Sequence, residues 1–176
     1  MNQFFRYAFR LLLFVLTQQF IGYRIPPLHE YFSVIFYFLF ILWLPFSIGR
    51  AGLLMLSLFT GLCMDFFTRT PGMHASACVF IGYVRPFLIN FLIPNKEVDF
   101  NYREPSVVSL GFVSYFTYAA LLTLLHHFIL FTVQAFQFGN GWHLIVKTLG
   151  SSIVSLLLIA LIEIIFTRKQ KFLTNT

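Results

Sequence analysis

The chain has 176 residues, of which 59% are hydrophobic and only 10% are charged. A composition this apolar leaves no room for a water-soluble domain of any size, so we expect the protein to fold in a membrane. The net charge of +6 does not indicate nucleic-acid binding, because the cations lie scattered at the ends of apolar segments and form no patch or stripe.

Six apolar stretches fill nearly the whole sequence. We predict membrane-spanning helices at residues 4–23, 31–46, 51–67, 73–93, 107–136 and 142–167. In hydrocarbon every backbone N–H and C=O must be bonded within the protein, and stretches near this length favour helices over barrel strands. The first stretch lacks a small-residue cleavage site after it, so we interpret it as a retained helix. The sequence therefore predicts an all-α integral membrane protein, a six-helix bundle forming one domain over residues 1–176.

Helix breakers and polar residues separate the predicted spans. Pro26 and Pro27 form the first break, and residues 69–72 (Arg-Thr-Pro-Gly) and Asn140-Gly141 mark later turns. The distinctly polar stretch is 95–106, at the end of which Ser106 is placed to cap a long fifth helix.

The distribution of Lys and Arg predicts the orientation, because these residues resist translocation. With six spans and an internal N-terminus, the inner face holds Arg6, Arg10, Arg50, Lys96, Arg103, Arg168, Lys169 and Lys171. The outer face holds Arg24, Arg69 and Lys147. We therefore expect both termini in the cytoplasm.

Asp65 lies near the outer end of the third span. An acid at mid-membrane costs about 2.5–3.5 kcal/mol on insertion scales, so it normally has a partner or a role. One interpretation is a local ion pair with Arg69, four residues on. Another begins from Ser57, Gly61 and Asp65, which recur every four residues as a strip of small side chains leading to the acid. Such strips let two helix backbones approach closely, and packing within the chain explains the strip as well as a partner site does.

His74, His126 and His127 also fall in the outer half of the predicted bundle. Adjacent histidines on a helix point about 100° apart, and no two histidines are spaced three or four residues apart as metal ligands on one helix would be. We therefore expect hydrogen bonding between helices, and we interpret Gln18 and Gln19 in the same way.

No catalytic arrangement stands out in the sequence. A Gly-rich phosphate loop, a nucleophile motif with a base and a zinc-protease helix are all missing. Cys63 and Cys78 lie in apolar segments without Cys or His at metal spacing, so we interpret them as packing residues. We expect no enzymatic activity, no metal and no other cofactor.

Arg85 is the other charged residue inside an apolar stretch. About a dozen residues separate it from His74, roughly 20 Å of helix, which is short for a full crossing. We therefore place Arg85 just below the inner headgroups, where Pro86 would kink the chain. Glu163, near the inner end of the last span, should lie at similar depth, and we predict an Arg85–Glu163 contact. Snorkelling of Arg85 to lipid phosphate is the competing interpretation.

Residues 44–86 resemble MreD, the integral-membrane rod-shape-determining family of bacteria. The closest stretch, 61–77, combines a Gly-x-x-x-Asp helix end, formed by Gly61 and Asp65, with a Gly turn that opens a helix rich in small residues. Met73-His74 and Arg85-Pro86 are similar to one branch of the family. The resemblance implies a six-helix bundle similar to the substrate-binding subunit of energy-coupling-factor vitamin transporters.

The resemblance also implies a function. MreD-like proteins act in the cell-elongation machinery of the bacterial inner membrane, where they help to control cell shape and peptidoglycan synthesis. The implied direct partner is the bitopic protein MreC, and the wider assembly includes MreB, RodA and a penicillin-binding transpeptidase.

Gly61 and Asp65 are the residues that the resemblance carries over, as packing residues that shape an outward pocket or a partner groove. The full set of helix-packing and partner candidates is Ser57, Gly61, Asp65, Pro71, Gly72, His74, Cys78 and Gly82. The candidates for ion pairs in the membrane are Asp65, Arg69, Arg85 and Glu163.

Two main functions stay open at this point. A scaffold would bind the transmembrane helix of MreC, whereas a vitamin-type transporter subunit would capture a small solute in an outward pocket lined by Asp65, His74 and His126. A lipid-handling enzyme or flippase is a third class, which needs an acid or base at mid-membrane depth with access to water.

Overall fold

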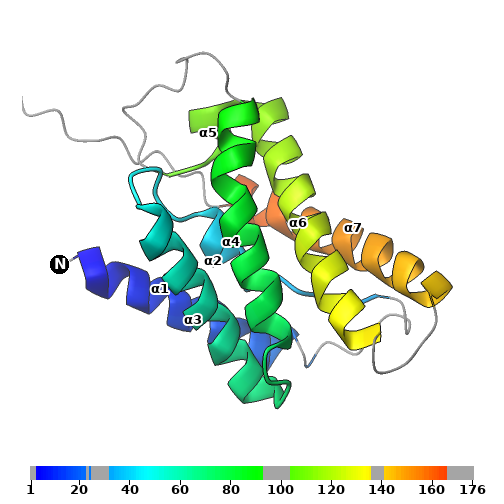
Figure 1. The fold of residues 1–176 in the computed structure, drawn as a ribbon. Helices are drawn as coiled ribbons and strands as arrows, with labels where there is room; N and C mark the ends of the chain where they lie inside the picture. Colours follow the sequence, from blue (N-terminus) through cyan, green and yellow to red (C-terminus); the bar gives the residue numbers. More distant parts are fainter. Residues whose placement is uncertain (1–2, 23, 25–31, 93–103, 136–140, 166–176) are drawn as a thin grey trace, which may run out of the picture.

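The computed structural model describes residues 3–22, 24, 32–92, 104–135 and 141–165, and every regular element in them is helical (Figure 1). In chain order the helices are α1 (Gln3–Thr17), the π-helix η1 (Gln18–Gly22), α2 (Leu39–Leu42), α3 (Arg50–Thr68), α4 (Met73–Leu92), α5 (Val107–Leu110), α6 (Phe112–Ala135) and α7 (Gly141–Ile165). The predicted breaks at Pro26-Pro27 and Asn140, most of the polar stretch 95–106 and the basic tail 168–171 lie outside the described residues.

Four of these helices, α3, α4, α6 and α7, are long and apolar enough to cross a membrane. Over the described residues the chain is therefore all-helical and has the long apolar helices typical of a membrane protein. In addition, α1 continues directly into η1, so that helical backbone runs from Gln3 to Gly22. The predicted spans 51–67, 73–93 and 142–167 agree with α3, α4 and α7 to within two residues at each end.

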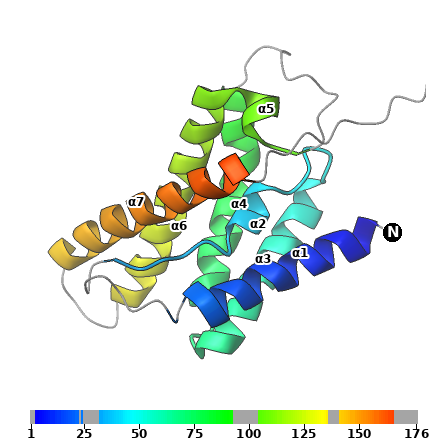
Figure 2. The ribbon, with the colours of Figure 1, turned by 180° about the vertical axis from the view of Figure 1, so that it is seen from behind.

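The long helices form two layers. Figure 1 shows α3, α4 and α6 side by side, with α4 between the other two, and Figure 2 shows α1 and α7 lying across the opposite face, apart from each other. The closest packing agrees with this view, because α4 packs against both α3 and α6, and α6 packs against α7. Residues 32–44 run between the two layers.

The predicted span 31–46 is wrong as a membrane-spanning helix. Residues 32–36 have no regular secondary structure, and between 32 and 44 only the four residues of α2 are helical. The side chains from Tyr37 to Leu42 are at most 2% exposed. Hydropathy cannot separate a helix surrounded by lipid from a segment surrounded by other helices, because both are apolar. The stretch is apolar because the protein buries it, and we call residues 32–44 the buried irregular segment.

Non-helical backbone at membrane depth is tolerated only where the protein satisfies its polar groups. Gln18, in η1, binds both a carbonyl and an N–H group at the start of the buried irregular segment. Its Nε2 donates to the Val34 carbonyl at 2.8 Å, and its Oε1 accepts from the Phe36 N–H at 2.7 Å. The π-helical turn therefore lies where a side chain of the first helix replaces a missing backbone partner.

Two serines of α7 satisfy further backbone groups of this segment. Ser151 Oγ accepts from the Ser33 N–H at 2.9 Å, and Ser155 Oγ donates to the Ile35 carbonyl at 2.7 Å. Both serines are fully buried. Small hydroxyl side chains on an otherwise apolar helix thus hold a stretch of non-helical backbone against it.

The predicted helix 107–136 is interrupted. Ser106 does cap a helix, since its hydroxyl accepts from the Ser109 N–H at 3.1 Å and the Ser109 hydroxyl accepts from the Ser106 N–H at 2.8 Å. That helix is the short α5, which ends at Leu110 and has Gly111 as its C-cap residue. Gly111 adopts φ 79°, a conformation that favours glycine, and α6 begins at the next residue. The apolar pattern continues through Gly111 and so did not reveal the break.

Candidate functional site

Asp65 caps the start of α4. Its Oδ2 accepts from the Gly72 and Ala75 N–H groups at 2.9 and 3.1 Å, and its Oδ1 accepts from the His74 N–H at 2.8 Å and the Thr70 hydroxyl at 3.3 Å. The carboxylate is buried against the positive end of the helix dipole. It thereby satisfies N–H groups that have no partner inside α4.

The predicted ion pair between Asp65 and Arg69 does not form. Arg69 ends α3 in the left-handed region with φ 57°, and its side chain is exposed. The chain then turns through Pro71 and Gly72, where Gly72 has φ 86°. This reversal swings α4 back over the end of α3, and it brings backbone N–H groups, in place of the guanidinium, to the acid.

The small-residue strip of α3 faces α4 of the same chain. A Cβ at Gly61 would lie 2.3 Å from Ala75 Cα, and a Cβ at Gly82 would lie 2.3 Å from Ser57 Oγ. Ser57 and Gly61 are buried. The strip is therefore covered within the bundle and is not a groove open to a partner.

A cluster of buried polar rings lies beside this seam. The Tyr37 hydroxyl is 2.8 Å from His74 Nδ1 and 2.9 Å from His126 Nε2, and it accepts a weak hydrogen bond from Cys78 Sγ at 3.7 Å. The His126 ring stacks on Phe38, with 4.4 Å between ring centroids. Tyr37 thus joins three elements of the bundle at one oxygen.

The cluster has a preferred arrangement of protons. The phenol has one proton, so it donates to one histidine and accepts from the other. His126 Nδ1 is buried without a partner, and an unpaired acceptor is tolerated better than an unpaired N–H donor. His126 therefore donates through Nε2 to Tyr37, and Tyr37 donates to His74 Nδ1. This leaves the proton of His74 on Nε2, which, unlike His126 Nδ1, keeps some solvent exposure.

His127 belongs to a different contact. Its Nδ1 lies 2.8 Å from the Thr123 carbonyl and therefore donates to it, and its Nε2 lies 3.2 Å from Ser155 Oγ. Ser155 is the residue that donates to the Ile35 carbonyl. His127 thus lies against the serine that holds the buried irregular segment, and the one proton of that serine goes to the Ile35 carbonyl.

A polar pocket opens over His74, at the end of the bundle where α3 ends and α4 begins. Its volume is about 200 Å³, and it is lined by Ser33, Ile35, Thr68, Thr70, Met73, His74, Leu130, Phe131, Gln134 and Lys147. Lys147 Nζ donates to Gln134 Oε1 at 3.1 Å and lies 4.9 Å from the centre of the Phe131 ring. Of the predicted pocket residues only His74 lines it. Asp65 is occupied by the α4 backbone, and His126 lies beneath Tyr37.

Arg85 lies inside the protein, so the competing interpretation of a side chain that snorkels to lipid phosphate is wrong. It is 2% exposed, its Nε donates to the Tyr118 hydroxyl at 2.9 Å, and its Nη2 donates to the Leu44 carbonyl. Tyr118 in turn donates to the Leu42 carbonyl at 3.0 Å. Arg85 and Tyr118 together bind the backbone carbonyls at the far end of the buried irregular segment, next to the C-terminal, negative end of the α2 dipole. Pro86 lies inside α4, which runs on to Leu92.

The predicted Arg85–Glu163 contact is also wrong. The Glu163 carboxylate accepts from the Tyr115 hydroxyl at 3.0 Å and from the Val107 N–H at 3.2 Å. The two charged residues lie on α4 and α7, and α6 packs between these helices and inserts its tyrosines. Similar depth in the membrane did not imply lateral contact. Among the described residues an ion pair forms instead between Arg10 and Glu104, whose Nη1 and Oε1 atoms are 2.8 Å apart although the residues are far apart in the sequence.

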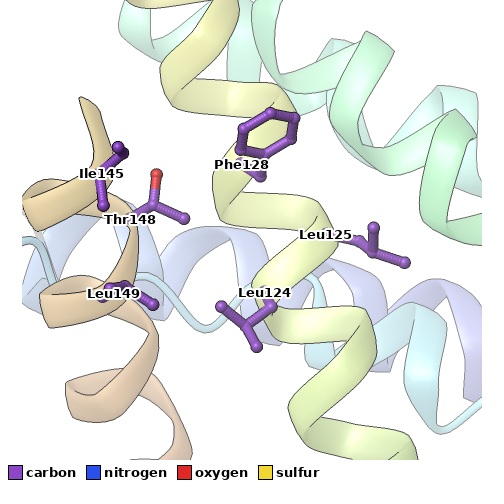
Figure 3. Close-up of a pocket in the computed structure, with 6 residues that line it drawn as sticks. All are labelled: Leu124, Leu125, Phe128, Ile145, Thr148 and Leu149. Atoms are coloured by element: carbon purple, nitrogen blue, oxygen red, sulfur yellow. The ribbon is translucent and has the colours of Figure 1, made fainter. Parts of the chain in front are cut away.

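Two apolar recesses also lie on the surface of the described residues. A groove of about 430 Å³ is lined by Arg10, Leu13, Phe14, Thr17, Ile21, Phe36, Trp43 and Ile162. A second recess, of about 300 Å³, lies between α6 and α7 and is lined by Leu124, Leu125, Phe128, Ile145, Thr148 and Leu149 (Figure 3). Thr148 supplies the one hydroxyl of this second recess and that oxygen has no hydrogen-bond partner, so the recess offers little to a polar ligand.

Several residues of the site were not identified from the sequence. Tyr37 and Lys147 carried no local signal, because their partners lie on other helices. The cluster Gly150-Ser151-Ser152 within an apolar helix was a usable signal for α7. In the part of the chain that the structure describes, no group of three or more His, Cys, Asp or Glu side chains is placed to hold a metal ion.

Comparison of the chain with protein-family models, with curated proteins and with solved structures finds no match in any of the three.

Proposed function

We propose that this protein is a non-enzymatic scaffold of the bacterial cell-elongation machinery, an MreD-like protein that binds the transmembrane helix of MreC. The residues that carry the resemblance support this proposal, because they form one structural unit. Gly61 lets α3 meet the start of α4, Asp65 caps α4, and Gly72 makes the turn between them. In this proposal the motif builds a rigid helical hairpin and binds no substrate.

The groove between α1 and α7 is the docking surface we propose for MreC. It opens on the face of the bundle shown in Figure 2, where α1 and α7 do not pack closely on each other. Leu13 and Ile21 on its rim are each about half exposed. Helices associate in membranes by close packing of complementary surfaces. At a helix diameter of roughly 10 Å, 430 Å³ is about the volume of one helical turn, so the groove accepts the side chains of one helix face.

The other parts of the proposal follow from the same resemblance. The protein lies in the bacterial inner membrane as a six-span bundle similar to the vitamin-binding transporter subunit, with residues 32–46 counted as an irregular crossing. Both termini are cytoplasmic, and the wider assembly contains MreB, RodA and a penicillin-binding transpeptidase. The vitamin-transport alternative is less well supported, because the polar pocket of about 200 Å³ is smaller than the roughly 300–1,000 Å³ of typical ligand sites.

Photo-crosslinking in membranes that contain an MreC-like protein tests the docking surface. Photoreactive residues at Leu13 and Ile162 lie in the groove, and those at Met55 and Phe66 lie on the exposed face of α3. We expect crosslinks to the MreC transmembrane helix from the groove positions alone. Crosslinks from α3 with none from the groove would place the partner elsewhere. Failure of the two proteins to co-purify would reject the scaffold function itself.

A further inference from the structure

The polar pocket over His74 is assembled from many parts of the chain. Ser33 comes from the buried irregular segment, Thr68 from the end of α3, His74 from α4, Gln134 from α6 and Lys147 from α7. Polar side chains contributed by five separate elements converge on one space. Such convergence is typical of a binding site and does not arise from the amphipathic face of a single helix.

Two strong donors in this pocket remain available to a ligand. His74 is 3% exposed, its Nδ1 is held by Tyr37, and its Nε2 has no hydrogen-bond partner among the described residues. Lys147 has three N–H donors, of which one is used by Gln134. Elsewhere in the bundle, the buried charges of Asp65 and Arg85 are occupied mainly by backbone groups. Here a buried imidazole N–H and an ammonium face the same space.

The positive charge of Lys147 in this pocket has no opposite charge beside it among the described residues. Lys147 is half-buried, and it forms no ion pair with any residue that the structure describes. The pocket lining contains no carboxylate. Asp65 is the nearest acid, but its oxygens are taken by the start of α4 and by Thr70. A cation inside a membrane protein is normally paired, so an anionic ligand would supply the missing charge.

Size and lining restrict the class of anion. A volume of 200 Å³ corresponds to about seven waters at roughly 30 Å³ each, which admits a molecule of about ten non-hydrogen atoms or fewer. Ile35, Met73, Leu130 and Phe131 form an apolar wall. A compact inorganic anion would desolvate against this wall without compensation, whereas an organic acid places an apolar body there.

From this geometry we propose that the pocket binds a small monocarboxylate, whose carboxylate group accepts from Lys147 Nζ and His74 Nε2 and whose apolar body packs against Phe131. Ser33 offers a further hydroxyl donor to the same group, whereas the Thr68 hydroxyl donates to the Met64 carbonyl. The proposal does not depend on the scaffold function, since pocket and groove lie on different parts of the bundle.

Benzoate and benzamide are suitable probes, because they have the same shape and differ in charge. Thermal unfolding of the full-length protein in detergent is measured with each probe, with inorganic phosphate, and with chloride at matched ionic strength. We expect a saturable rise in melting temperature with benzoate and none with the others. An equal response to benzamide, or a response to phosphate without one to benzoate, would overturn the proposal.

Substitution of Lys147 tests whether benzoate binds in the polar pocket. Lys147→Met should weaken benzoate binding at least tenfold, and Lys147→Arg should retain it. Arg69→Asn is the matched control, because it removes an exposed cation at the same end of the bundle and leaves a residue that tolerates positive φ. If Lys147→Met melts too low without ligand, Lys147→Gln takes its place. Unchanged benzoate affinity without the lysine would reject the site.

Discussion

The close approach of α3 and α4 gives the sharpest test of the fold. A Cβ at Gly61 would lie 2.3 Å from Ala75 Cα and 2.6 Å from Ala75 N. Both are backbone atoms held by the capped start of α4, so they cannot move aside as a flexible side chain would. Gly61→Ala therefore forces the two helices apart.

The magnitude follows from two opposing terms. Overpacking costs about 1–3 kcal/mol, with the upper end expected against backbone. Alanine in a helix gains up to about 1 kcal/mol over glycine. The net loss is about 2 kcal/mol, which corresponds to a fall of about 4–8 °C in melting temperature for a chain of this size.

Gly52 provides the matched control in the same helix. A Cβ there would meet only Ile48 Cγ1 at 3.7 Å, so Gly52→Ala should keep or raise the melting temperature. The measurement is thermal unfolding in detergent, followed through the fluorescence of the buried Trp43. If Gly61→Ala proves as stable as Gly52→Ala, the backbones of α3 and α4 do not meet at Gly61 and Ala75.

Three further substitutions test the polar contacts by the same assay. Asp65→Asn should destabilise by about 1–3 kcal/mol, because its amide would turn an NH₂ group toward backbone N–H donors, and a neutral result would contradict the cap. Tyr37→Phe should also cost about 1–3 kcal/mol, because ring nitrogens of His74 and His126 lose their common partner; an unchanged melting temperature would argue against the cluster. Gln18→Leu should cost at least as much, since it leaves two backbone groups of the buried irregular segment unpaired. Gln19→Leu, which removes a buried oxygen without a partner, should be neutral or stabilising, and equal effects at both positions would contradict the assignment.

The sequence predicted most of the long helices correctly because their signals are local. Long apolar runs bounded by Gly, Pro or Ser define α3, α4 and α7, and the turn at 69–72 ends and restarts a helix where expected. Residues 31–46 form an equally apolar run in the sequence, but the structure does not make them a long helix. In the described part of this stretch the apolar side chains are buried among the helices, and long-range contacts such as that of Gln18 with Val34 decide the path of the backbone.

In the candidate site, too, the sequence predicted the local contacts and missed the contacts between distant helices. Gly61 and Asp65 are separated by one helical turn, and that spacing identified them as a unit. Asp65 binds residues just beyond the turn, so even its partners are nearly local. The contacts of Lys147 and Tyr37 require knowledge of which helices are neighbours. The same missing knowledge produced the incorrect Arg85–Glu163 pair.

These contacts change how polar residues inside this membrane protein should be interpreted. An ionisable residue at membrane depth is by default a candidate for function, and Asp65 and Arg85 were the obvious candidates here. Both are occupied by backbone groups, Asp65 at the start of α4 and Arg85 at the end of the buried irregular segment. Loss of activity after their substitution would therefore report loss of the fold. Asp65 and Arg85 are therefore set aside as residues that bind backbone groups. Lys147 is a half-buried cation that forms no ion pair with a described residue, and it is the charged group to which a ligand is best assigned.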